Sequence, residues 1–149
     1  MTDLLLAFAH HGFVFALLAL LAAELAIVAR GVQSADVRRL SGLDAAYGLT
    51  AMVILVVGFV RVFWGAKGSA FFLHNPVFWA KLAFFLAVGL VSAMPTIRFV
   101  RWKKQLQADP AFVPAPAEVA AVRRWITTEL VLFVPIPMLA AAMVRGYGY

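Results

Sequence analysis

Hydrophobic residues fill four long segments of the chain, and polar residues gather in the stretches between them. The apolar segments are about residues 4–29, 43–64, 76–100 and 124–144. A membrane-spanning helix needs about 20 predominantly apolar residues to cross roughly 30 Å of hydrocarbon. The pattern therefore predicts an all-α fold, an integral membrane four-helix bundle. We expect a single domain over residues 1–149. We also expect a loop at about residues 101–123, on the cytoplasmic side for the reason given below.

Particular residues predict local features of these helices. Asn75-Pro76 is typical of a helix N-cap followed by proline at the first helical position. The segment Ser41-Gly-Leu-Asp44 resembles a capping box at the start of the second span. Pro135 and Pro137 each remove a backbone donor, so they should interrupt the fourth span. Tyr47 lies near a span end and is typical of the aromatic belt at a membrane interface.

Composition agrees with a protein surrounded by lipid. Hydrophobic residues make up 64% of the 149 residues, whereas soluble domains have about 45–50%. The chain has no cysteine, which excludes disulfides, iron–sulfur clusters and thiolate metal sites.

The formal net charge of +6 is unevenly distributed. Nine of the thirteen basic residues fall in two loops on the same predicted side: Arg30, Arg38, Arg39, Arg98, Arg101, Lys103, Lys104, Arg123 and Arg124. The positive-inside rule places these loops in the cytoplasm and both termini on the outer, periplasmic side of a bacterial inner membrane. We expect the loops to contact anionic lipid headgroups, and we expect no nucleic-acid partner.

Ionisable side chains inside the apolar segments are the candidate functional residues, because burying a charge in hydrocarbon is costly. They are His10, His11, Glu24, Lys81 and Glu129, with Asp44 and Arg61 near span ends. Helical residues fourteen apart nearly superpose. His10 therefore shares a face with Glu24 and is a better inward-facing candidate than His11. In the second span, one stripe contains Tyr47, Ala51, Ile54, Gly58 and Arg61, with Asp44 at its edge.

Predicted depth separates these residues by charge. The outer half holds only basic or neutral groups: His10, His11, Arg61, Lys81 and Arg145. The inner half holds the acids, with arginines close by. We expect a buried polar network there, formed by Glu24, Asp44, Arg98 and Glu129.

Unpaired cations in a low-dielectric site are strongly unfavourable, so they either reach water or bind an anion. Haem b suits the second option, because it combines propionates, an apolar ring and an axial site for neutral histidine, and helical bundles hold such cofactors. His10 is the candidate iron ligand, with His11 as the other choice. Arg61, Lys67 and Lys81 are candidate partners for the anionic groups.

A second histidine ligand would have to be His74, folded inward from the outer loop. Otherwise the iron is five-coordinate, has a sixth ligand other than histidine, or is shared across a homodimer.

Two resemblances arise at these residues. Six segments, residues 43–48, 58–61, 67–68, 74–81, 92–98 and 143–146, are similar to an uncharacterised bacterial family of predicted small four-span membrane proteins. That family has no established activity to transfer.

The second resemblance is more distant. His10 or His11, Arg38-Arg39, Lys81-Leu82 and Glu129 are similar to positions in the HemJ-type protoporphyrinogen oxidases, which are membrane proteins that bind haem b. Trp79 and Thr128 stand where the HemJ pattern has histidine and asparagine. The resemblance therefore implies haem binding more than it implies oxidase activity.

Four functional hypotheses remain at this point. The first is a haem-binding membrane protein, which as an enzyme would be a haem-dependent oxidoreductase that exchanges electrons with a quinone or another partner. The second is a HemJ-like oxidase. The third is a transport or assembly protein without a cofactor, with a proton or ion path through His10, Glu24, Lys81 and Glu129. The fourth is purely structural, with Glu24 paired to Arg30 or Arg98, Glu129 paired to Arg98, and Lys81 reaching water.

Overall fold

The chain folds into a bundle of α-helices. The computed structural model describes residues 2–65 and 68–148, and no strand occurs within those ranges. The helices are α1 (Thr2–Ala29), α2 (Ser34–Trp64), α3 (Gly68–Leu73), α4 (Pro76–Ala108), α5 (Pro116–Phe133) and α6 (Pro135–Val144).

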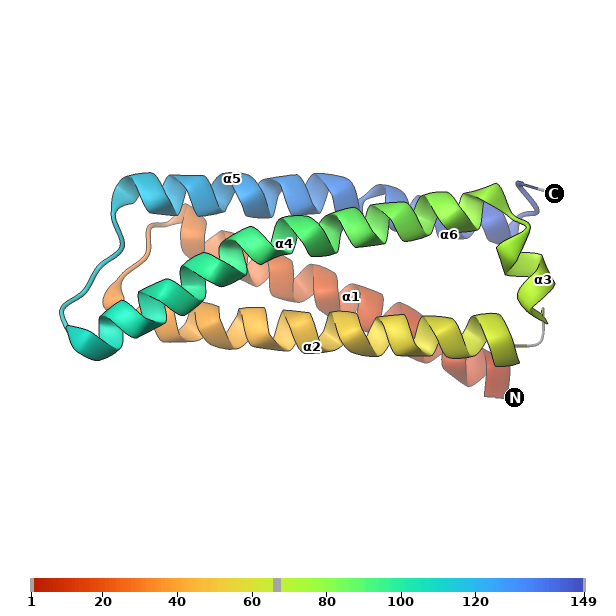
Figure 1. Cartoon of the computed structure of the whole chain (residues 1–149), viewed down its shortest axis with the longest axis horizontal. Helices are drawn as coiled ribbons and strands as arrows, with labels where there is room; N and C mark the ends of the chain where they lie inside the picture. The colour runs from red at the N-terminus through yellow and green to blue at the C-terminus, as the bar shows by residue number, and fades with distance from the viewer. Residues whose placement is uncertain (1, 66–67, 149) are drawn as a thin grey trace.

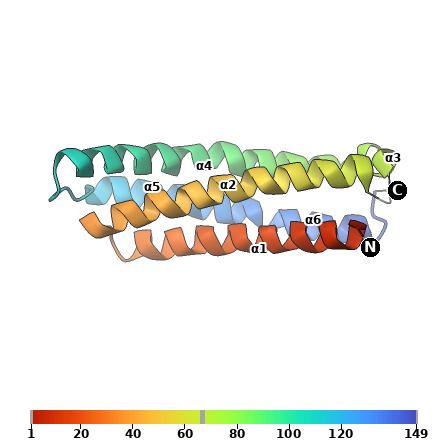
Figure 2. The same cartoon turned by 90° about the horizontal axis from the view of Figure 1, so that it is seen from below.

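Four units run lengthwise through the bundle: α1, α2, α4, and α5 continued by α6 (Figure 1). Each is long and apolar enough to cross a membrane, which confirms the predicted fold class. Both termini and α3 lie at one end of the rod, and the turns at residues 30–33 and 109–115 lie at the other (Figures 1 and 2). We call these the terminal end and the loop end.

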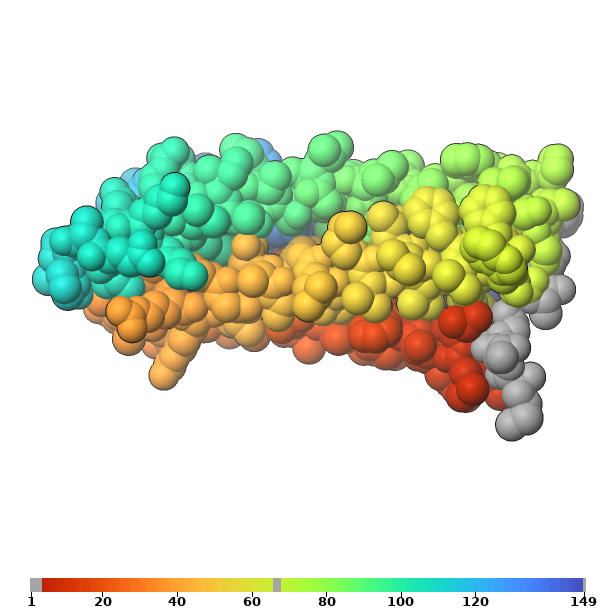
Figure 3. Space-filling view, turned by 60° about the horizontal axis from the view of Figure 1, so that its bottom comes forward, coloured from red at the N-terminus to blue at the C-terminus, as the bar shows by residue number. Residues whose placement is uncertain are grey.

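Helix α2 lies between α1 and α4 on the face shown in Figure 3. Helix α1 packs on α2 and α5, and α4 packs on α2, α5 and α6. Helix α6 does not pack on α1, since no Cα atom of one lies within 8 Å of the other. The close neighbours of α1 are therefore α2 and α5.

The break that separates α5 from α6 falls at Val134, as the prolines predicted. The Val134 N–H still donates to Leu130 O at 3.3 Å. Pro135 and Pro137 have no N–H to continue the ladder. Pro95, by contrast, lies within the unbroken helix α4.

Helix α2 begins earlier than the sequence pattern suggested. Its N-cap is Gln33, whose N–H donates to Asp36 Oδ2 at 3.1 Å. The prediction of a cap at Ser41–Asp44 was therefore wrong. The hydrophobic pattern marks where lipid ends, whereas the helical ladder continues through the polar residues beyond it.

The interior is narrow, and much of the apolar surface faces outward. Leu17 and Leu21 are almost completely buried, together with Phe99 and Trp102 of α4. Leu90, in contrast, is 77% exposed. Large apolar side chains are exposed along the length of the bundle, as expected for helices that lipid surrounds.

Polar contacts close the loop end. Arg30 donates to the buried Asp36 at 2.6 Å, and the Ser34 hydroxyl donates to Phe112 O at 2.6 Å. Glu118 of α5 accepts from Arg98 at 2.7 Å and from Trp102 Nε1 at 3.1 Å. Helices α4 and α5 are therefore joined by one carboxylate.

The terminal end is closed around Asn75, which is completely buried. Its Oδ1 accepts from Val77 N–H at 2.8 Å, which confirms the predicted N-cap of α4. Its Nδ2 donates to Tyr147 O at 3.2 Å. Gly148 has φ +95°, and a Cβ atom there would collide with the Asn75 amide. The C-terminal turn thus rests on the cap of α4.

We expect Gly148→Ala to lower thermal stability more than Gly146→Ala. Both glycines have positive φ, but a Cβ atom on Gly146 meets nothing within 4 Å. The cost of the backbone conformation is shared, so the difference reports loss of the Asn75 contact, about 1 kcal/mol. The measurement is the melting temperature of each variant in detergent. Equal melting temperatures would contradict the contact.

We expect Glu118→Leu to destabilise the bundle by about 1–3 kcal/mol, because the buried Trp102 N–H loses its acceptor. Glu118→Gln keeps a carbonyl oxygen at that position and should cost less. Unfolding followed by tryptophan fluorescence measures both values. A glutamine variant as unstable as the leucine variant would show that charge, rather than the tryptophan contact, dominates.

Candidate functional site

The predicted site residues form two groups inside the bundle. His10, Arg61 and Lys81, from α1, α2 and α4, make up what we call the basic cluster, in the terminal half. Glu24, Asp44 and Glu129, from α1, α2 and α5, make up the acid cluster, further toward the loop end.

The face of α1 that was predicted to turn inward does so. Leu17, Leu21 and Glu24 are all at most 2% exposed. His10 lies on this face and is partly buried, whereas His11 is exposed. The His10 ring lies against α2 at Gly58, where a Cβ atom would be 3.6 Å from its Cε1.

Each group in the basic cluster is near other basic groups. The groups that act electrostatically on His10 are Lys81, Arg61 and His11, and Arg61 acts on Lys81. Lys81 Nζ lies 5.8 Å from the centre of the Phe78 ring. His10 Nδ1 and Arg61 Nε are buried and have no hydrogen-bond partner among the residues that the structure describes.

The other candidate histidine ligands are exposed, although the His11 ring lies 6.1 Å from the His10 ring, centre to centre. His11 Nδ1 is 2.7 Å from Ala7 O, and His74 Nδ1 is 3.0 Å from Ala70 O, with both side chains exposed. The structure therefore does not bring His74 beside His10. Lys67 lies outside the described residues. Within residues 2–65 and 68–148, no three His, Cys, Asp or Glu side chains are placed to hold a metal ion together.

The acid cluster is more deeply buried than the basic one. Glu24 is 2% exposed and Glu129 is 1% exposed, and Oε1 of each has no hydrogen-bond partner in the described part of the chain. The Tyr47 hydroxyl lies beside the Glu129 carboxylate. Asp44, which is partly exposed, accepts from the Thr96 hydroxyl at 2.7 Å.

Arg98 does not join this network. It pairs with Glu118, just as Arg30 pairs with Asp36. The expected pairing of Glu24 with Arg30 or Arg98, and of Glu129 with Arg98, is thus not found among the described residues. The reason is that α2 and α5 extend beyond the apolar segments and present their own acids to these arginines.

Tyr47 was missed by the sequence analysis, which interpreted it as an interfacial aromatic residue. It is 5% exposed and contacts Glu129. The available signal was its position on the α2 stripe, one helical turn after Asp44.

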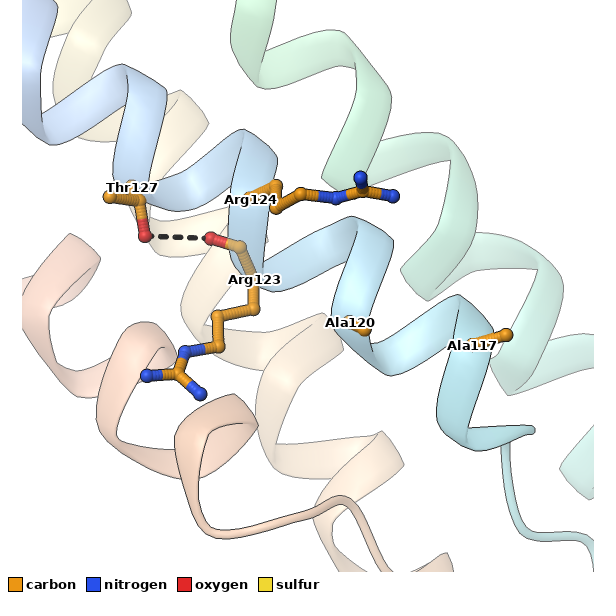
Figure 4. Close-up of a pocket in the computed structure, with 5 residues that line it drawn as sticks. All are labelled: Ala117, Ala120, Arg123, Arg124 and Thr127. Carbon is orange, nitrogen blue, oxygen red and sulfur yellow. Dashed lines mark hydrogen bonds between the residues drawn. The ribbon is translucent and has the colours of Figure 1, made fainter.

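A hollow on the surface of α5 is distinct from both clusters. It is lined by Ala117, Ala120, Arg123, Arg124 and Thr127, and the two guanidinium groups extend away from each other (Figure 4). Neither His10 nor Glu24 lines it.

Comparison with known proteins places the chain in a family. The family model described as "Predicted membrane protein (DUF2214)" matches residues 2–148. No curated protein and no solved structure matches the chain, so the resemblance to HemJ-type oxidases stays a prediction from the residues quoted for it. The match across nearly the whole length, together with four helices of membrane-spanning length, shows that the chain belongs to the DUF2214 family of predicted membrane proteins.

Proposed function

We propose that this membrane protein binds an anionic cofactor, haem b or a similar tetrapyrrole, at the basic cluster. One observation carries the proposal. His10 Nδ1 and Arg61 Nε are buried and have no hydrogen-bond partner in residues 2–65 and 68–148, in a cluster where the neighbouring charged groups are basic.

The energetic reason lies in desolvation and repulsion. A buried donor or acceptor left unpaired costs about 1–3 kcal/mol, and more when the group is charged. Like charges also repel more strongly in a low-dielectric interior than in water. An anion between Arg61 and Lys81 would reduce both costs.

The donor set suits haem b. Its propionates would pair with Arg61 and Lys81, and its iron accepts a neutral imidazole such as His10. When bound, it would supply one-electron chemistry. The Gly58 side of the His10 ring is occupied by α2. The cofactor would therefore have to approach the His10 ring from a side other than that of Gly58.

The orientation in the membrane bears on access to this site. The basic residues near the loop end favour the cytoplasmic side for that end. We therefore place the basic cluster in the periplasmic half of a bacterial inner membrane, with anionic headgroups at the basic loops.

We expect the purified protein, supplied with haem b, to show a Soret absorption band that is lost in His10→Ala. The matched control is His11→Ala, because His11 is adjacent but exposed and should leave the band in place. Absorption spectra of the detergent-purified variants measure this. Protein that stays colourless after reconstitution, or equal spectra for the two variants, would overturn the proposal.

We expect Arg61→Gln and Lys81→Gln each to weaken haem b binding about tenfold, which corresponds to about 1.4 kcal/mol. Each change removes one positive partner of a propionate. Haem b dimethyl ester has no propionate charge, so its affinity should respond much less. Spectroscopic titration with both compounds gives the dissociation constants. The exposed Arg145, changed to glutamine, is the control. Equal effects on haem and ester would contradict pairing with the propionates.

A further inference from the structure

The three carboxyl groups of the acid cluster need a positive charge or a proton beside them, and the basic cluster is too distant to supply it. Glu24, Asp44 and Glu129 come from three helices and lie near enough inside the membrane-spanning bundle for the other two acids to act electrostatically on Glu24. We propose that this cluster is a proton-binding site, which at neutral pH holds at least one proton among its three carboxyl groups. Asp44, the partly exposed member, would be the group through which the proton exchanges.

Burial without partners is the first argument. Glu24 and Glu129 are at least 98% buried, and each has an Oε1 that accepts no hydrogen bond in the described residues. The charged groups that act on Glu24 are the two other acids of the cluster. Three ionised carboxylates would therefore repel one another in a medium that solvates charge poorly. A bound proton removes one charge and supplies a donor.

The second argument is a count of hydrogens at Thr96. Its Oγ1 lies 2.7 Å from Asp44 Oδ1 and 3.0 Å from Ser92 O. A hydroxyl has one hydrogen to donate and two lone pairs that accept. If Asp44 is ionised, both neighbours are acceptors and one hydrogen must serve two contacts. If Asp44 is protonated, its O–H donates to Thr96, and the Thr96 O–H donates to Ser92 O.

Among the described residues, the surroundings of the acid cluster provide no basic side chain as a counter-charge. Helix α4 presents Thr96 to the cluster, whereas its Ser92 hydroxyl donates to Gly89 O and its Arg98 donates to Glu118. On α1 and α2 the groups that face the acids are Glu24, Asp44 and Tyr47, and on α5 the group is Glu129. Residues 135–144 of α6 contain no ionisable side chain.

The ligand is a proton rather than a metal ion. A metal ion such as Ca²⁺ needs several oxygen ligands around one point, and the described residues do not offer three acidic or histidine groups in such an arrangement. A proton needs one oxygen and benefits from a second.

Infrared difference spectroscopy tests the site directly, because a neutral carboxyl group has a C=O stretch that the carboxylate lacks. The chain has seven acidic residues, so assignment is practicable. We expect the wild-type protein in lipid nanodiscs to show this band at neutral pH, shifted in D2O and lost as the pH rises. Glu24→Gln, Asp44→Asn or Glu129→Gln should each reduce or shift it.

Glu118→Gln is the matched control, since Glu118 is already paired with Arg98 and should leave the band unchanged. Circular dichroism checks that each variant is folded. The wild-type titration needs no variant, so a misfolded mutant cannot hide the answer. Absence of the band from the wild type at neutral pH, or an unchanged band in all three variants, would overturn the proposal. The same titration on haem-free His10→Ala protein separates this result from the haem proposal.

Discussion

The structure is governed by the absence of water around its helices. Lipid offers no hydrogen bonds, so every charged side chain in the interior must find its counterpart within the bundle. At the loop end this requirement is met, because Arg30 forms an ion pair with Asp36 and Arg98 forms one with Glu118. In the middle and at the terminal half it is not met within the described residues, and the unmatched groups have gathered by sign.

The prolines of the fourth span influence which helices lie beside α1, the helix that carries His10. Pro135 and Pro137 end α5, and α6 continues against α4 rather than α1. Helix α5 contacts α1, whereas no Cα atom of α6 lies within 8 Å of a Cα atom of α1. The His10 ring of α1 lies instead against Gly58 of α2.

Much of the fold and part of the candidate site could be predicted from the sequence. The features that could not be predicted depend on contacts between helices and on where the helices end. Hydrophobic length predicted four spans, and helical phase placed Glu24, Leu21 and Leu17 on one buried face. The N-cap at Asn75 and the helix break at Pro135 and Pro137 could be predicted from the neighbouring residues alone. Hydropathy could not show that the helices continue beyond the lipid, so the partners of Arg30 and Arg98 were missed. Nor could one helix's phase show that Gly58 receives the His10 ring or that Tyr47 contacts Glu129, because those contacts depend on how two helices pack.

The two clusters cannot neutralise each other, and this makes the case for two separate ligands. His10 and Glu24 lie fourteen residues apart on α1, which is about 21 Å at the rise of an α-helix. At an effective dielectric constant of about 20, unit charges at that distance interact by only about 0.8 kcal/mol. That is less than the cost of leaving even one buried polar group unpaired. Each cluster must therefore be balanced where it stands, which favours the proposed anion at the basic cluster and the proposed proton at the acid cluster.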